Sequence, residues 1–178
     1  MSDLEIDGNS LRIEDIINIT NNSGNVILAD EAKEKMYQSR RVIEKIIDSD
    51  DVVYGVNTGF GSLSSVTIDS DRLEDLQANL IRSHACGVGE KMKPEHVLMM
   101  MLIRANSIAK GYSGTRIEVM ELLLSMINCN IAPVIPRIGS LGASGDLAPL
   151  SHLALAMMGE GECQVLVDGE WIKKDTKE

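Results

Sequence analysis

Apolar residues recur along most of the chain at the spacing of amphipathic helices, so the fold is predicted to be mainly α. The clearest case is the segment 113–128, where apolar positions fall three or four residues apart and would line one helix face. The same pattern predicts further helices over residues 12–20, 30–48, 70–83, 94–110 and 147–158. Pro94 would begin one of them and Gly111 would end it, as these residue types commonly do.

The periodicity also predicts which residues face the core. In the helix 113–128 they are Ile117, Met120, Leu123, Leu124 and Ile127. In the helix 30–48, with Asp30 expected as its cap, they are Met36, Val42, Ile43, Ile46 and Ile47. Both helices are therefore predicted to pack by one face and to leave the other in solvent.

A minor β component is expected beside the helices. Residues 163–173 are predicted to form a hairpin that turns at Asp168-Gly169, a pair that favours tight β-turns. Residues 52–54 suggest a brief strand, and Pro133 and Pro136 predict an extended approach to the segment that follows. The fold class is therefore mainly α with a small hairpin near the C-terminus.

Composition narrows the class of protein. The 178 residues suffice for one domain with a sizeable core, and ten methionines fill part of the space left by a low aromatic content of 3%. A net charge of −10 argues against nucleic acid and anionic membranes as partners. There is no apolar run of membrane-spanning length and no signal peptide. The three cysteines have no metal-ligand spacing, so we expect reduced thiols, a cytoplasmic protein and no bound metal.

The segment 139–150 has the most unusual sequence in the chain. It holds three glycines in its first seven residues and then becomes apolar and helix-like after Asp146. Asp146 could cap that helix, which would place Ala143-Ser144-Gly145 in a flexible turn before a helix N-terminus that favours negative charge. A glycine-rich helix entry with a capping aspartate is the simpler interpretation of these residues.

The tripeptide also suits a reaction of the backbone with itself. The unshielded amide nitrogen of Gly145 could attack the carbonyl carbon of Ala143, and loss of that oxygen as water with dehydration of Ser144 would give a methylidene-imidazolone ring. Such a ring is an electrophile that no ordinary side chain supplies. The whole segment 139–150 closely resembles the active-site signature of the aromatic amino acid ammonia-lyases, and of their histidine-specific members in particular. This resemblance implies that the ring forms autocatalytically here and that Asp146 supports it.

A second glycine-rich stretch covers residues 54–62. It lacks the Gly-Lys-Ser/Thr of a phosphate loop and the third glycine of a dinucleotide fingerprint, so we expect no nucleotide cofactor. A mobile surface loop is the alternative that its composition favours. The stretch resembles a segment of the same lyase family whose tyrosine serves in proton transfer. The resemblance assigns that role to Tyr54 and a supporting one to Gly61.

His84 lies at the predicted end of the helix 70–83, where a histidine commonly caps the helix or interacts with its dipole. The surrounding segment 76–85 resembles the part of the lyases that selects the substrate. Histidine-specific members carry Ser-His there, phenylalanine-specific ones usually have an apolar residue, and tyrosine-specific ones commonly have a His-Leu pair. Ser83-His84 followed by Ala85 fits the first pattern, which implies that His84 recognises an imidazole.

The resemblance extends through residues 104–116 and covers nearly the whole sequence, but it matches only the N-terminal part of a much longer family fold. It implies a homotetramer, with each site built from several subunits or with a complementary C-terminal chain, that converts L-histidine to urocanate and ammonia. A phenylalanine or tyrosine ammonia-lyase and an aminomutase remain alternatives. So does an inactive truncated subunit or interaction module, because the chain stops soon after the hairpin.

Overall fold

The computed structural model describes residues 3–22, 24–49, 51–59, 68 and 72–177, and in that part the mainly α prediction is confirmed. Its helices are α1 (Ile13–Asn22), α2 (Asp30–Ile47), α3 (Leu73–His84), α4 (Pro94–Ala109), α5 (Ile117–Asn128) and α6 (Leu147–Met157). Its strands are β1 (Leu4–Ile6), β2 (Val26–Leu28), β3 (Val88–Lys91), β4 (Ile131–Pro133), β5 (Pro136–Ile138), β6 (Glu162–Val167) and β7 (Glu170–Asp175). None of these helices is long and apolar enough to cross a bilayer.

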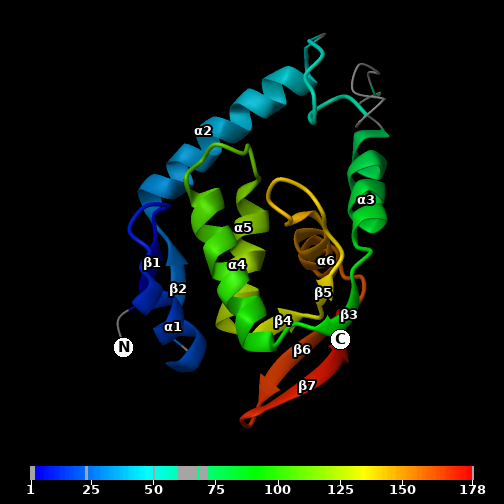
Figure 1. The fold of residues 1–178 in the computed structure, drawn as a ribbon. Coiled ribbons are helices and arrows are strands. Elements are labelled where there is room, and N and C mark those ends of the chain that lie inside the picture. Colours follow the sequence, from blue (N-terminus) through cyan, green and yellow to red (C-terminus); the bar gives the residue numbers. More distant parts are fainter. Residues whose placement is uncertain (1–2, 23, 50, 60–67, 69–71, 178) are drawn as a thin grey trace.

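The core lies where α4 and α5 pack against each other in the middle of the molecule (Figure 1). Pro94 begins α4, and the helix buries residues on more than one side: Val97, Leu98, Met101, Leu102, Ala105, Ile108 and Ala109. α4 is therefore a central helix with neighbours on several sides, not a surface helix with one buried face. The five positions predicted to be buried in α5 are all buried. The first half of α2 closes the core with Ala32 and Met36.

Three small sheets tie the helices together. β1 and β2 pair in parallel around α1, which packs on α4. β3 pairs antiparallel with β5, and β6 lies between β4 and β7 in a three-stranded antiparallel sheet. The predicted hairpin is confirmed: β6 and β7 turn at Asp168 and Gly169, both of which adopt positive φ. These pairings connect segments that are distant in sequence, and the β3–β5 pair is the one that bears on the candidate site.

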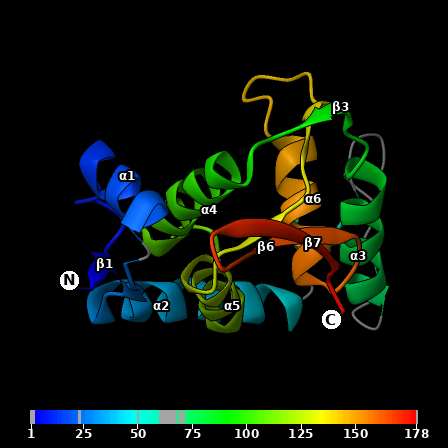
Figure 2. The same cartoon turned by 90° about the horizontal axis from the view of Figure 1, so that it is seen from below.

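A second pair of helices, α3 and α6, lies side by side away from α1 and β1 (Figure 2). None of the α3 residues is fully buried, whereas α6 buries Ala148, Leu153 and Ala156. At one end of the pair the guanidinium of Arg82 binds both carboxylate oxygens of Glu160, with Nη2 2.6 Å from Oε1. This pairing raises the pKa of Arg82 and lowers that of Glu160.

Four local predictions were wrong. Residues 52–54 form no strand but lead into a turn. The helix predicted from Ser113 begins at Ile117, because Gly114 has a φ of +63° and lies so close to Ile43 that a Cβ would meet its Cγ1 at 2.2 Å. Ala29, not Asp30, stands at the N-cap of α2, and Val42 in the second half of that helix is 56% exposed. The predicted start of α3 near residues 69–70 lies outside the described residues.

Candidate functional site

Tyr54 lies on a turn that buried polar side chains hold in place. Asn57 and Thr58 are only 6% and 1% exposed. Asn57 Oδ1 accepts the Val53 N–H at 2.9 Å, and its Nδ2 donates to the Asp51 carbonyl at 2.7 Å. Because the Val53 N–H is taken by a side chain, it is not available to a neighbouring strand, which explains why the expected strand is absent. The turn leaves Tyr54 63% exposed.

Thr58 completes this turn, and neither it nor Asn57 was singled out from the sequence. Its hydroxyl donates to the Gly59 carbonyl at 2.9 Å, while the backbone of Asn57 accepts the Ile68 N–H at 2.9 Å. Buried polar groups of this kind are usually fully hydrogen-bonded, and these are. Gly61, the predicted supporting residue, lies outside the described residues. The signal that could have identified Asn57 is an Asx residue in a glycine-rich turn, which commonly bonds nearby backbone.

The Ala143-Ser144-Gly145 turn is open by comparison. All three residues are exposed, Gly145 has a φ of +70°, and a Cβ added to it would meet nothing within 4 Å. The loop carrying them, in gold, extends beyond the body of the ribbon (Figure 2). Gly145 is therefore exposed, with open space where a side chain would lie.

Asp146 stands at the N-cap of α6 as predicted, but it makes no capping hydrogen bond. Its carboxylate accepts the hydroxyl of Ser144 instead. The first turn of α6 is served by Ser140, whose Oγ accepts the Ala148 N–H at 3.2 Å. The capping role expected for Asp146 is therefore wrong, because Ser140 fills it and leaves the carboxylate directed at Ser144. A serine that accepts an N–H from a residue eight positions further along the chain is not a spacing that capping rules recognise.

His84 is the last residue of α3, and its ring is bound to the helix end. Nδ1 lies 2.9 Å from the Leu80 carbonyl and 3.0 Å from the Ser83 hydroxyl. A carbonyl only accepts, so Nδ1 carries the proton, and in the neutral ring Nε2 is an acceptor. Nδ1 thus caps the helix end, as the simpler interpretation expected, while the lone pair of Nε2 could accept a hydrogen bond from a ligand N–H.

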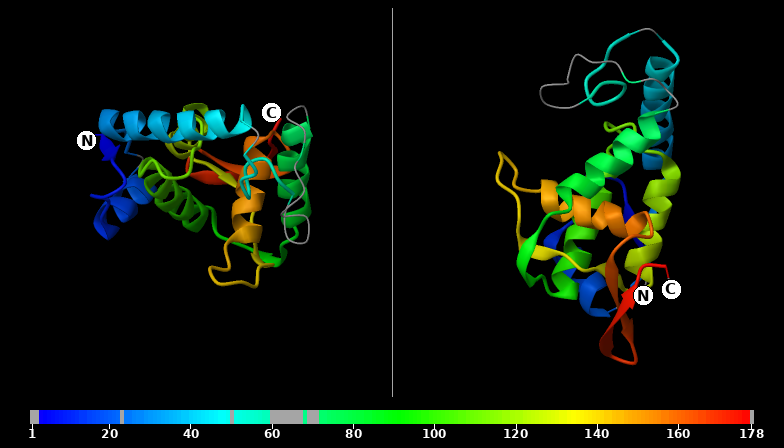
Figure 3. Two further views of the ribbon diagram at one scale, coloured as in Figure 1. Left: turned by 90° about the horizontal axis from the view of Figure 1, so that it is seen from above. Right: turned by 90° about the vertical axis from the view of Figure 1, so that its right-hand side faces the viewer.

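The structure brings His84 towards the Ala143-Ser144-Gly145 loop and leaves Tyr54 further away. Val88 pairs with Ile138, so the segment after His84 runs beside the start of that loop. The Tyr54 turn instead faces the first residues of α3 across a hollow of about 520 Å³ lined by Gly55 and Leu73. Since α3 has 12 residues, Tyr54 and His84 lie near opposite ends of a helix about 18 Å long. In Figure 3 (right), the segment around residues 51–59, in cyan, lies at the top of the ribbon, and the gold loop projects at the left.

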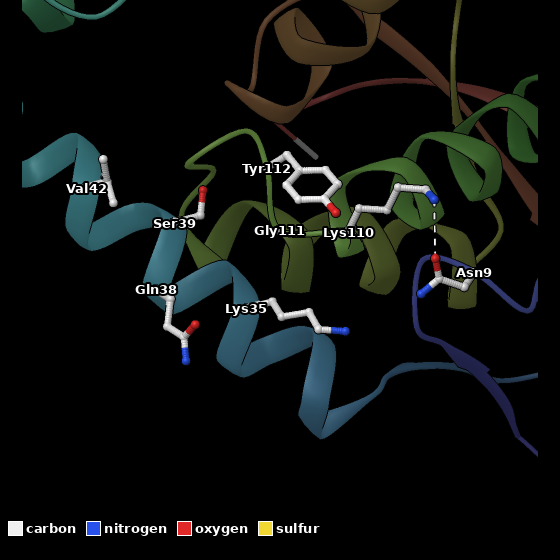
Figure 4. A pocket seen from close by; sticks show the side chains of 8 residues that line it. All are labelled: Asn9, Lys35, Gln38, Ser39, Val42, Lys110, Gly111 and Tyr112. Carbon is white, nitrogen blue, oxygen red and sulfur yellow. Dashed lines mark hydrogen bonds between the residues drawn. The ribbon is translucent and has the colours of Figure 1, made fainter.

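A separate hollow of about 400 Å³ contains none of these residues. It lies between α2 and the loop after α4, where Lys110 Nζ donates to Asn9 Oδ1 at 3.3 Å (Figure 4). Lys35 on its rim is paired with Glu31 at 2.7 Å, which raises the pKa of Lys35. Its cations therefore have partners already, and the hollow offers no chemistry of the predicted kind. Among the described residues, no cluster of three or more His, Cys, Asp or Glu could hold a metal ion.

Comparison with known proteins gives a consistent picture. A sequence profile described as aromatic amino acid lyase matches residues 11–176. The histidine ammonia-lyase of Caldanaerobacter subterraneus subsp. tengcongensis is 49% identical over 162 residues, which make up 91% of this chain and 32% of that protein. The chain therefore spans about a third of the length of the curated relatives it matches.

Solved structures agree in fold. The histidine ammonia-lyase from Trypanosoma cruzi superposes with a TM-score of 0.86 at 37% identity, over 99% of this chain and 33% of that one. The tyrosine aminomutase from Streptomyces globisporus superposes equally well, with a TM-score of 0.86 at 35% identity over 99% of this chain and 32% of that one. The helical arrangement is thus common to proteins named for different reactions.

Proposed function

Because the chain belongs to the aromatic amino acid lyase family, we propose that it forms the N-terminal part of an enzyme that eliminates ammonia from L-histidine and releases urocanate. The observation that carries the proposal is the 49% identity to a protein named histidine ammonia-lyase over 91% of this chain. The Ser83-His84 pair, with the acceptor nitrogen of His84 left for a ligand, supports histidine as the substrate.

The proposed electrophile is a methylidene-imidazolone made from Ala143-Ser144-Gly145. The exposed turn fits this group, because the Cβ position of Gly145 is open among the described residues and the Ser144 hydroxyl already bonds the Asp146 carboxylate. In the closure, the Gly145 nitrogen bonds to the Ala143 carbonyl carbon and that oxygen leaves as water; Ser144 then loses its hydroxyl and α-proton as a second water. Asp146 orients the Ser144 hydroxyl for this loss. Once formed, the ring supplies an electrophile that activates the substrate's amino group.

The chain's own side chains have two further roles. Tyr54 handles the proton on the β-carbon, which is weakly acidic and needs a positioned base. His84 accepts the imidazole N–H of the substrate through Nε2. We expect the remaining two thirds of the family fold to cover the exposed turn and complete the site, as part of a homotetramer. Cys86, Cys129 and Cys163 form no disulfide, which fits a reducing, cytoplasmic setting.

The test is complementation. The 178-residue chain is purified alone and also co-expressed with the C-terminal two thirds of the Caldanaerobacter relative, and each sample is incubated with L-histidine while urocanate is followed by its absorbance. We expect product only from the complemented assembly. An assembly that forms stoichiometrically but produces no urocanate would contradict the proposal.

An aminomutase is the second candidate, because the aminomutase from Streptomyces globisporus superposes as well as the lyase from Trypanosoma cruzi. The same incubation separates the two reactions when products are resolved by chromatography, since an aminomutase returns the ammonia and gives a β-amino acid. L-Phenylalanine and L-tyrosine are offered in parallel. His84→Leu should lose turnover of L-histidine, and unchanged kinetics would remove His84 from substrate recognition.

A further inference from the structure

His152 on α6 makes a contact that none of the roles above uses. Its Nε2 accepts the backbone N–H of Gly87 at 3.1 Å. Gly87 lies three residues after His84, and His152 lies seven residues after Gly145. One hydrogen bond therefore joins the end of the helix that carries His84 to the helix that begins after the reactive turn.

The contact sits in a tightly packed junction. A Cβ added to Gly87 would meet His152 Nε2 at 3.0 Å and Pro136 Cβ at 3.1 Å. A Cβ added to Gly139 would meet Gly87 Cα at 2.7 Å and Ala148 Cβ at 3.2 Å. A larger residue at Gly139 would push the backbone of Gly87 away, and one at Gly87 would require His152 and Pro136 to shift by a few tenths of an ångström. The chain after His84 is thus fixed against both β5 and the first turn of α6.

The hydrogen bond also fixes the state of the histidine ring. Nε2 can accept an N–H only when it carries no proton, so His152 is neutral with its hydrogen on Nδ1. Burial, which lowers the pKa of His152, favours this neutral form. The other tie between α3 and α6, Arg82 with Glu160, is largely exposed and lies at the far end of α6. Exposed pairs of this kind hold elements together weakly.

We propose that His152 is a positioning residue: by accepting the Gly87 N–H it places His84 relative to the Ala143-Ser144-Gly145 turn, and so sets how the substrate's imidazole is presented to that turn. The proposal rests on the proposed function for the roles of His84 and the turn. It assigns to His152 no contact with the substrate.

Three variants test it. His152→Leu removes the acceptor and keeps an apolar side chain, whereas His152→Gln keeps an acceptor oxygen. Glu160→Gln is the matched control, because it weakens the α3–α6 interface without touching Gly87. In the 178-residue chain, amide hydrogen exchange of Gly87 should speed up by about tenfold or more in His152→Leu, which corresponds to about 1.4 kcal/mol, and should stay slow in the other two. The ¹⁵N spectrum of the His84 ring should change only in His152→Leu.

In the complemented assembly, His152→Leu should raise KM for L-histidine by about tenfold with kcat changed by less than about threefold, and His152→Gln should restore most of the loss. A kcat loss alone, or equal KM values in all three variants, would overturn the positioning role. If His152→Leu does not fold, the ¹⁵N shifts of His152 in the unaltered chain still decide, because a proton on Nε2 overturns the proposal. If even the unaltered assembly makes no urocanate, the proposed function fails, while Gly87 exchange and the His84 spectrum still show whether His152 places His84.

Discussion

The Tyr54 turn and the Ala143-Ser144-Gly145 turn are both glycine-rich, but they are held in different ways. The first is built around Asn57 and Thr58, whose buried side chains bond the backbone on either side. The second is exposed throughout: Ser144 donates its hydroxyl to Asp146 next to the turn, and the Ala148 N–H donates to Ser140 across the base of the loop. A turn with its own buried polar centre keeps its shape locally, whereas an open turn takes its shape from whatever later covers it.

This difference bears on the proposed ring. Closure asks the Gly145 nitrogen to approach the Ala143 carbonyl more closely than an ordinary turn permits, and such strain persists only where the surroundings over-determine the backbone. Apart from its chain neighbours, none of the described residues has an atom within 4 Å of the Cβ position of Gly145. In the isolated chain the Tyr54 turn is therefore held by its own buried side chains, whereas the described residues give the Ala143-Ser144-Gly145 turn no such support.

The largest effect should come from Ser144→Ala, which removes the hydroxyl that closure must expel. Turnover of L-histidine by the complemented assembly should fall by on the order of 10⁶, the lower end of typical enzymatic rate enhancements. The free energy of unfolding of the 178-residue chain should change by less than about 0.5 kcal/mol, because Ser144 is exposed. Turnover is measured by urocanate formation and stability by urea unfolding. Ser140→Ala is the control that perturbs the same loop without removing the reacting group.

The intact mass of the chain shows directly whether the ring has formed. We expect the isolated chain to keep its full mass and the chain in the complemented assembly to lose the mass of two waters. An isolated chain that already lacks two waters would show that this segment alone holds the turn in the strained conformation.

Tyr54→Phe should give the next largest effect. It keeps the ring and deletes the ionisable group, so kcat in the complemented assembly should fall by about 10²–10⁴, the usual contribution of a general acid or base. KM and stability should change little. Steady-state kinetics test this, with Tyr112→Phe as the control because Tyr112 is exposed on the separate hollow shown in Figure 4. An effect on KM alone would mean that the hydroxyl only binds substrate.

Asn57→Ala should affect stability rather than chemistry in the isolated chain. It removes the hydrogen bonds to the Val53 N–H and the Asp51 carbonyl, which are partly buried, at a loss of about 0.5–1.5 kcal/mol for each bond. The free energy of unfolding from urea titration measures this. Asn57→Asp keeps the acceptor for the Val53 N–H but sets a carboxylate oxygen against the Asp51 carbonyl, so it should also be less stable than the unaltered chain. If Asn57→Ala were no less stable than Ser144→Ala, the two turns would not differ as described.

The smallest effect is the pH dependence of stability that arises from His152, on the helix that follows the Ala143-Ser144-Gly145 turn. Burial lowers the pKa of His152 below its ordinary value near 6.5. Just below pH 6.5 the unfolded chain therefore binds more protons than the folded chain, so stability should rise with pH between the lowered pKa and about 6.5. Urea unfolding between about pH 5 and pH 8 tests this. His152→Gln should flatten that part of the profile, and an unaltered slope would assign it to other groups.

The patterns that depend on near neighbours were predictable from the sequence. The buried face of α5, the start of α4 at Pro94 and the hairpin at Asp168-Gly169 follow from side-chain periodicity, a fixed proline φ and residues that adopt positive φ. Tyr54, His84 and Ala143-Ser144-Gly145 could be chosen as site residues because each stands in a distinctive motif. Their roles stay predictions, since they depend on a resemblance.

Contacts between distant segments decided the rest. Val42 was expected on the same face as Met36, but it lies six residues further on, about 240° around the helix, and only Met36 is buried. The hydroxyl of Ser140, not the carboxylate of Asp146, accepts an N–H in the first turn of α6. The close contact between Ile43 and Gly114 explains why α5 begins only at Ile117. The contact of His152 with Gly87 joins residues 65 positions apart. Periodicity describes which face of an element is apolar, but only the packed chain determines what that face meets and which polar group reaches a given N–H.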